Sequence, residues 1–128
     1  MLKTVAKQQY IASKKGAYIC QITKVCSKGG VETPSVTPTS IAGIIDIKKA
    51  GHVVNATIAV TPTVSGFSNV ATNFPPALFT NRFTGVVAST GQISKSFCSV
   101  ESTGLCRVNC TGEINTQLLF SFTYITAD

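Results

Sequence analysis

The stretch Leu118–Ile125 reads LLFSFTYI, and its side-chain pattern decides the fold class of this chain. Leucine or an aromatic residue stands at every second position from Leu118 to Tyr124. Alternate residues of an extended strand point to the same face, so these side chains line one face of a β-strand. The other face carries Leu119 and Ile125 and is also partly apolar, as in strands that are covered on both sides. We therefore expect a central or doubly covered strand here.

Shorter versions of this pattern recur along the chain. Val53–Val60 alternates in the same way, with apolar side chains on one face from Val54 onward. A spacing of about 8–12 residues between such segments is typical of a β-sandwich, and no segment predicts a helix longer than two turns. The sequence therefore predicts an all-β fold, an antiparallel β-sandwich or jelly roll of about eight strands. Further strands are expected at residues 17–26, 41–47, 78–88, 91–98 and 105–110.

Glycine and proline mark the expected breaks between strands. Lys48–Gly51 is interpreted as a turn. The Pro75-Pro76 pair predicts a loop, because proline lacks the backbone N–H that a strand ladder needs. Gly85, inside the segment 78–88, is expected to mark a bulge or a bend.

The basic residues are unevenly distributed along the 128 residues of the chain. The formal net charge is +6, yet residues 31–128 hold five basic and five acidic side chains, so the excess lies in residues 1–30. We expect a basic N-terminal arm or connector with one strand at 1–30, a Pro/Thr linker at 31–40 and a β-sandwich domain at 41–128. The lysines of the extended arm are Lys3, Lys7, Lys14, Lys15, Lys24 and Lys28.

The composition is apolar and weakly charged. Hydrophobic residues make up 44% of the chain and charged residues 12%, about half of the usual charged fraction. A surface of Ser, Thr, Asn and Gly is typical of β-sandwiches and of subunits that bury a face against neighbours. No apolar run approaches the roughly 20 residues of a membrane span, so no membrane insertion is expected. The N-terminal residues also lack the unbroken apolar core of a secretory signal.

Five cysteines are many for this length, and they form an early pair and a late trio. No two have the C-x-x-C spacing of zinc sites and His52 is the only histidine, so neither a metal nor another cofactor is expected. The sequence favours disulfides, and an odd number leaves one thiol free or paired with another chain. The alternative is that the cysteines are small buried hydrophobic residues. The candidates for internal or inter-subunit disulfides are Cys20, Cys26, Cys98, Cys106 and Cys110.

The sequence offers no catalytic constellation, so we do not expect an enzyme. His52 follows Gly51 in an expected turn, the acidic residues are scattered, and the glycines fit neither a P-loop nor a dinucleotide-binding pattern. The lysines of the arm are able to neutralise phosphates. The arm contains no arginine, however, and the planar fork of arginine suits phosphate better, so nucleic-acid binding is favoured less than self-association.

Self-association is the class of function that these features favour. A strand at 17–26, between the start of the arm and the 31–40 linker, is able to add to the sheet edge of a neighbour through main-chain hydrogen bonds. The cysteines then join the subunits covalently. The alternative is an internal arrangement, in which this strand pairs within its own sandwich and Cys20 or Cys26 bonds to Cys98, Cys106 or Cys110.

The C-terminal part of the sequence resembles a known family. Gly91–Phe97 reads GQISKSF, Cys110–Gly112 reads CTG, and a closing strand runs to Phe122–Tyr124. Over about 35 residues these features look like those of bacterial endospore appendage subunits. The resemblance implies a small jelly-roll protein that stacks into fibres through an N-terminal connector whose cysteines cross-link subunits. It implies the connector role for Cys20 or Cys26 and the acceptor role for Cys98, Cys106 or Cys110.

We therefore expect a self-assembling structural subunit of an extracellular fibre or surface layer, such as a spore or cell-surface fibre, whose partners are copies of itself. Assembly inside a cell that later lyses reconciles disulfides with the missing signal pattern. Two other interpretations stay open. One is a virion coat protein whose basic arm contacts the genome, and the other is a monomeric β-sandwich module that binds a glycan or a protein.

Overall fold

The computed structural model of this protein describes residues 30–127. The contacts within Thr33–Asp128 define one compact unit, in which all the strands of the described range lie. The described residues contain β-strands and no helix, which confirms the all-β prediction. No segment in this part of the chain forms a helix able to span a membrane. The predicted strand at 17–26 and the arm up to residue 29 lie outside the described residues.

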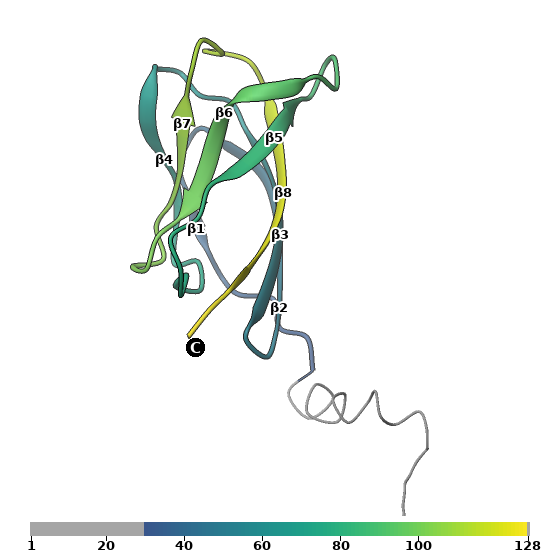
Figure 1. Ribbon diagram of the computed structural model, residues 1–128, viewed down its shortest axis with the longest axis vertical. Helices are drawn as coiled ribbons and strands as arrows, with labels where there is room; N and C mark the ends of the chain where they lie inside the picture. Colours follow the sequence, from purple (N-terminus) through teal and green to yellow (C-terminus); the bar gives the residue numbers. More distant parts are fainter. Residues whose placement is uncertain (1–29, 128) are drawn as a thin grey trace, which may run out of the picture. The chain divides into compact units, whose positions relative to one another are not determined.

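The strands, shown in Figure 1, are β1 (Thr37–Pro38), β2 (Ala42–Ala50), β3 (Val53–Val60), β4 (Gly66–Thr72), β5 (Phe83–Val87), β6 (Ile93–Val100), β7 (Cys106–Cys110) and β8 (Leu118–Ile125). β8 alternates between buried and exposed side chains at every position, so the predicted period of two is confirmed there. β3 follows the same rule over its first six residues. These two strands pair along their whole length.

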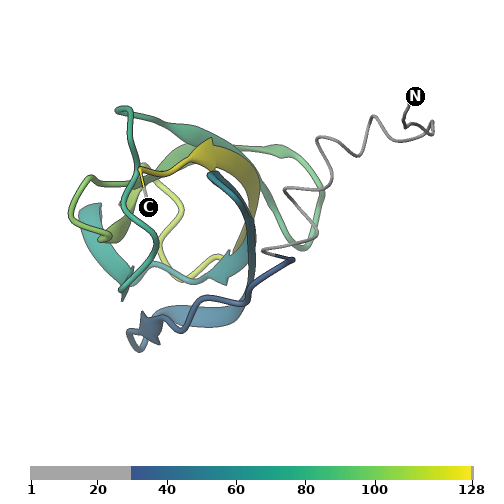
Figure 2. The same ribbon diagram turned by 90° about the horizontal axis from the view of Figure 1, so that it is seen from below.

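All strand pairs are antiparallel, and the strands form a single sheet in the order β1-β4-β7-β6-β5-β8-β3-β2. Three pairs are nested in the sequence: β5 with β6, β4 with β7, and β3 with β8. A long two-stranded ribbon that folds over on itself gives this nesting, as in jelly rolls. The sheet curls until it is nearly closed, and Figure 2 shows its strands around a common centre. This confirms the predicted β-sandwich or jelly-roll class.

β5 joins the two halves of the curled sheet. Phe83 and Thr84 pair with β6, Val87 pairs with β8, and Val86 pairs with both strands. Gly85 lies between Thr84 and Val86, where the pairing with β6 shifts its register. The irregularity predicted at this glycine is thus confirmed, and it marks the point where β5 begins to pair with β8.

The curled sheet encloses one hydrophobic core. Leu118, Phe120 and Ile58 are almost completely buried in it. Phe83 of β5 stacks on Phe122 of β8, with ring centroids 4.3 Å apart. Aromatic pairs of this kind contribute about 0.5–1.5 kcal/mol beyond the area that they bury. The core therefore binds β5 to β8 at the point where few backbone pairs connect them.

Two strand predictions are wrong in their bounds. β2 continues through Lys48–Ala50, so the predicted turn begins too early and the observed turn falls at Gly51 and His52. The segment 78–88 becomes a strand only at Phe83, and residues 78–82 form a loop. In both cases the predicted bounds are wrong because pairing with distant strands decides where a strand begins and ends. A short stretch of sequence carries no information on that pairing.

Candidate functional site

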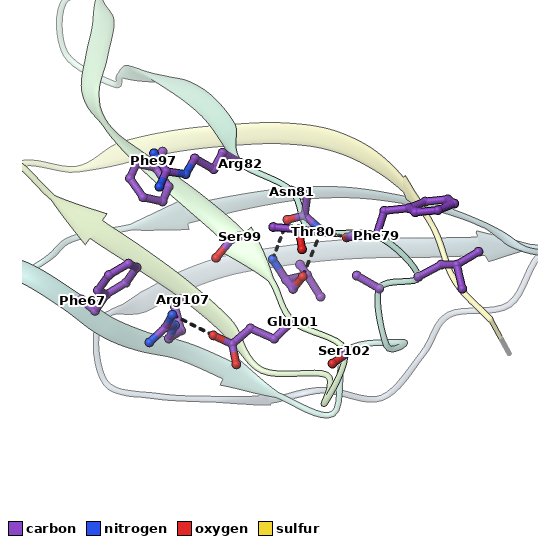
Figure 3. Close-up of a pocket in the computed structure, with 13 residues that line it drawn as sticks. Phe67, Phe79, Thr80, Asn81, Arg82, Phe97, Ser99, Glu101, Ser102 and Arg107 are labelled. Carbon is purple, nitrogen blue, oxygen red and sulfur yellow. Dashed lines mark hydrogen bonds and ion pairs between the residues drawn. The ribbon is translucent and has the colours of Figure 1, made fainter.

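A cleft of about 570 Å³ opens on the outer face of the sheet, beside the loop that precedes β5. Its floor comes from β4, β6 and β7, whose opposite face covers the core. Residues 77–82 form its wall. Ligand pockets commonly measure about 300–1,000 Å³, so the cleft has the size of a small-molecule site. Figure 3 shows the lining side chains, which include Phe67, Phe79, Asn81, Arg82, Phe97, Glu101 and Arg107.

Two pairs of arginine and phenylalanine lie together in the cleft (Figure 3). The guanidinium carbon of Arg82 is 4.5 Å from the ring centroid of Phe97, and that of Arg107 is 4.0 Å from the ring centroid of Phe67. The two rings meet edge to face with centroids 6.0 Å apart. Each ring face attracts a guanidinium, and the N–H groups at the guanidinium edge stay available to acceptors. The four side chains therefore form a continuous row.

The charges of this row are not balanced within the cleft. Arg107 donates a hydrogen bond to the Glu101 carboxylate at 2.8 Å. Arg82 has no acidic partner among residues 30–127. The Nε atom of Arg107 is buried and has no hydrogen-bond acceptor in the same range. Two guanidinium groups and one carboxylate leave the cleft with one excess positive charge.

Asn81 fixes the wall of the cleft against β6. Its Oδ1 accepts a hydrogen bond from the backbone N–H of Val100 at 2.9 Å, and its Nδ2 donates to the Val100 carbonyl at 3.0 Å. Nδ2 also donates to the carbonyl of Phe79, in the loop itself, at 3.0 Å. The Asn81 side chain thus bonds both backbone groups of Val100, as a neighbouring strand would. The wall is held in place before any ligand binds, and such preorganisation favours binding.

A second polar cluster surrounds Glu113 near the start of β6. The carboxylate accepts hydrogen bonds from the hydroxyls of Ser94 and Ser96, both at 2.6 Å, and from the backbone N–H of Lys95 at 3.1 Å. Desolvation alone raises the pKa of this carboxyl, but the hydrogen bonds from the two serines and the backbone together hold the pKa below its ordinary value. All of these donors belong to β6, so the cluster joins Glu113 to that strand and stabilises the fold.

Cys98, Cys106 and Cys110 are free thiols buried in the core. Burial raises the pKa of Cys98 well above the ordinary thiol value, and a hydrogen bond with Cys106 adds to this rise. Structural thiols of this kind are inert. For these three cysteines, the structure therefore agrees with the interpretation as small buried hydrophobic residues. Disulfides that involve Cys20 or Cys26 stay a prediction, because both residues lie outside the described range.

β2 forms the longer open edge of the sheet. Over Ala42–Ala50 it pairs with β3 on one side, and no strand within residues 30–127 pairs with its other side. Ile44 on this strand is 73% exposed. At the opposite edge, β1 covers the end of β4 through Ala71 and Thr72. The open edge and the cleft are two surfaces, within residues 30–127, at which a partner could bind.

The remaining predicted site residues divide into two groups. His52 lies exposed in the turn between β2 and β3, as expected. No group of three or more metal-binding side chains occurs within the described range. The lysines of the arm lie outside that range, namely Lys3, Lys7, Lys14, Lys15, Lys24 and Lys28.

The sequence does not predict the cleft, because its residues come from three strands and a loop. One signal was present in the alternation of β6. Ser96 and Cys98 face the core, which places the larger apolar Phe97 on the outer face. This outward-facing phenylalanine is the sign in the sequence of β6 that an apolar side chain lies on the outer face.

Comparisons with known proteins do not assign the chain to a family. No family model matches it, and no curated protein matches it. The open edge and the cleft are therefore the features from which a function is inferred.

Proposed function

We propose that the protein is a self-assembling structural subunit of an extracellular fibre or surface layer, of the kind found on spores or cells. The observation that carries this proposal is the open edge of β2, which is nine residues long. The unpaired N–H and C=O groups of such an edge are a template for a strand from another chain. Strand addition uses these backbone groups for affinity and alternate side chains for register.

The sheet face beside this edge also suits burial against another subunit. On β3 and β8 its centre is uncharged: Thr57 and Ser121 lie opposite each other, and their hydroxyls hydrogen-bond at 3.2 Å. Asp46 of β2 lies beside Thr57 on the same face and pairs with Lys48 at 3.1 Å. At one end Val53 pairs with Ile125, and both side chains are about two-fifths exposed, at 44% and 41%. Charged residues are depleted in the centre of stable interfaces, so the β3 and β8 part of this face suits such a centre, whereas the Asp46–Lys48 pair lies on the edge strand β2.

The incoming strand in this proposal is residues 17–26 of another copy, which are rich in β-favouring residues. β2 restricts where this strand pairs. A bulge lies between Ala42 and Ile45, and Lys48 is exposed toward the other end. Bulges and edge lysines discourage pairing, so the contact centres on Ile45–Ile47. Because the contact joins two different surfaces, it propagates as an open filament unless the rotation closes a ring.

We assign the covalent link between subunits to Cys20 and Cys26. The three cysteines of the core are at most 3% exposed, so a neighbour's thiol has no route to them while the sheet is intact. Subunits joined through the other two cysteines dissociate only after reduction. Denaturing gels with and without reductant therefore show a ladder that collapses to the monomer when reductant is added.

Electron microscopy of purified full-length protein tests the proposal, and filaments are the expected result. A variant that lacks residues 1–29 keeps the described fold and stays monomeric. A synthetic peptide of residues 17–26, added in excess to full-length protein, occupies the β2 edge and shortens the filaments. A peptide of the same composition in scrambled order is the matched control and leaves their length unchanged.

Two results would contradict the proposal. Filaments formed by the truncated protein would show that residues 1–29 are not the connecting element. A full-length protein that remains monomeric at high concentration would exclude self-assembly itself, and closed shells containing nucleic acid would indicate a coat protein.

A further inference from the structure

We propose that the cleft between β6 and residues 77–82 binds a small carboxylate that carries a flat apolar group, such as an arylacetate. In this assignment, Arg82 binds the carboxylate and an exposed apolar side chain of the lining contacts the apolar group. The inference does not rest on self-assembly, because every residue that it uses lies within one copy of the chain.

The anionic part of the ligand follows from Arg82. This side chain has its guanidinium held over the Phe97 ring at 4.5 Å, and no acidic residue within 30–127 neutralises it. A guanidinium that is stacked on a ring keeps the N–H donors along its edge available. Two of these donors match the spacing of the two oxygens of a carboxylate. The second guanidinium, that of Arg107, already has Glu101 as its partner. The cleft therefore accommodates one negative charge, and Arg82 is its binding residue.

The apolar part follows from the aromatic surface around the cleft. Phe67, Leu78 and Phe79 line it and are 49%, 50% and 68% exposed. In Figure 3, Phe79 lies apart from Phe67, with Asn81 between them in the view. Large exposed apolar side chains gathered around a concave site indicate a contact surface. A flat apolar group that lies against one of these side chains removes water from both apolar surfaces, which favours binding.

The shape of the site favours a small molecule over a long chain. The volume of about 570 Å³ holds a ligand of modest size, and the wall is fixed by three hydrogen bonds of the Asn81 amide. Polar lining groups besides the arginines include the hydroxyls of Ser99 and Ser102. Polar and apolar side chains line the cleft in similar numbers, which suits a small molecule with one charged end and one apolar face.

Fluorine NMR of the ligand tests this assignment on the full-length chain, whether or not it is assembled. The probe is para-fluorophenylacetate. Its neutral counterpart is the corresponding fluorophenylethanol, and fluoroacetate is the anion without an apolar group. We expect saturable binding of the probe with a dissociation constant of about a millimolar or below, as its size allows. The other two compounds should bind at least about tenfold more weakly, since each lacks one of the two contacts.

Arg82→Gln is the matching protein variant, and Arg82 is exposed, so the fold tolerates the change. It should weaken binding of the probe by about tenfold or more, because the charge-assisted hydrogen bonds are lost. Lys48→Gln removes one positive charge on β2, outside the cleft, and should leave binding unchanged. The assignment is overturned if the probe does not saturate, if the neutral compound or fluoroacetate binds as well, or if the two variants behave alike.

Discussion

Gly85 lies directly against the carbonyl oxygen of Leu119, on the strand beside it. A Cβ at this position would also meet the Phe120 ring, with a closest approach of 2.7 Å. Backbone cannot yield as a flexible side chain does, so Gly85→Ala must push β5 away from β8. We expect this substitution to lower the free energy of unfolding by about 2–3 kcal/mol, the cost of overpacking a rigid site. Urea unfolding followed by circular dichroism measures this value.

Gly43→Ala is the matched control for Gly85→Ala. Gly43 is also in a strand, and its Cβ would meet Ala59 at 3.5 Å, an ordinary contact. Its effect should stay within about 0.5 kcal/mol, as for most surface substitutions. Equal effects of the two substitutions would show that loss of glycine flexibility, and not the contact with Leu119, determines stability at Gly85.

The sequence predicts those strands whose two faces differ consistently along their length. β8 alternates over its whole length and β3 over its first six residues, so the local sequence reveals which face of each strand is buried. β4 is not predicted, because a bulge between Asn69 and Ala71 shifts the phase of its alternation. It also exposes Phe67 on the outer face. β4 is held in the sheet by its pairing with β7, which a local sequence pattern does not reveal.

The cleft is less predictable than the fold, because its geometry depends on distant residues. Arg82, Phe97 and Arg107 are separated along the chain, and only the pairing of β6 with β7 brings the last two to the same face. The exposed pair Leu78 and Phe79 suggested a strand, whereas these side chains line a loop that Asn81 holds in place. Hydrophobicity alone does not distinguish a core position from a lining position.

Glu113 makes the stability of the protein depend on pH. Its pKa in the folded state is below the ordinary value of 4.5, so the unfolded chain binds more protons between the two values. The stabilisation is therefore complete above the ordinary pKa and is lost as the pH falls through the lower, folded pKa. At pH 7, Glu113→Gln should cost about 1–2 kcal/mol, and this difference from the wild type should shrink in acid. Urea unfolding over a pH series measures it.

The serines that donate to Glu113 provide the control. Ser94→Ala with Ser96→Ala removes both hydroxyl donors and keeps the carboxylate. In this double variant, the pKa of Glu113 moves up toward its ordinary value, so the acid-dependent part of the stability should decrease. A pH dependence as large as that of the wild type would mean that other carboxyl groups cause it.

Burial of the core cysteines predicts that their thiols react slowly. Cys98 and Cys106 are fully buried, and the raised pKa of Cys98 keeps it protonated near neutral pH. Alkylation requires an accessible thiolate. The two cysteines therefore react only when the sheet opens transiently. We expect iodoacetamide at pH 8 to modify these two sites at least about a hundredfold more slowly in native protein than in urea. Mass spectrometry of the digested protein resolves each site, and rapid labelling of Cys98 without denaturant would be inconsistent with its burial.

Asn81 should stabilise the protein more than an exposed loop residue does. Its side chain bonds both backbone groups of Val100, so Asn81→Ala leaves a half-buried donor and acceptor without partners. We expect a loss of about 2–3 kcal/mol in the free energy of unfolding and faster hydrogen exchange at the Val100 amide. Asn81→Asp keeps the acceptor for that amide but loses the donor, so it should preserve the protection of Val100 and still lower stability. Unchanged exchange in Asn81→Ala would show that solvent replaces the side chain at no cost, and the wall of the cleft would then depend on Ala77 and its bond to Glu101.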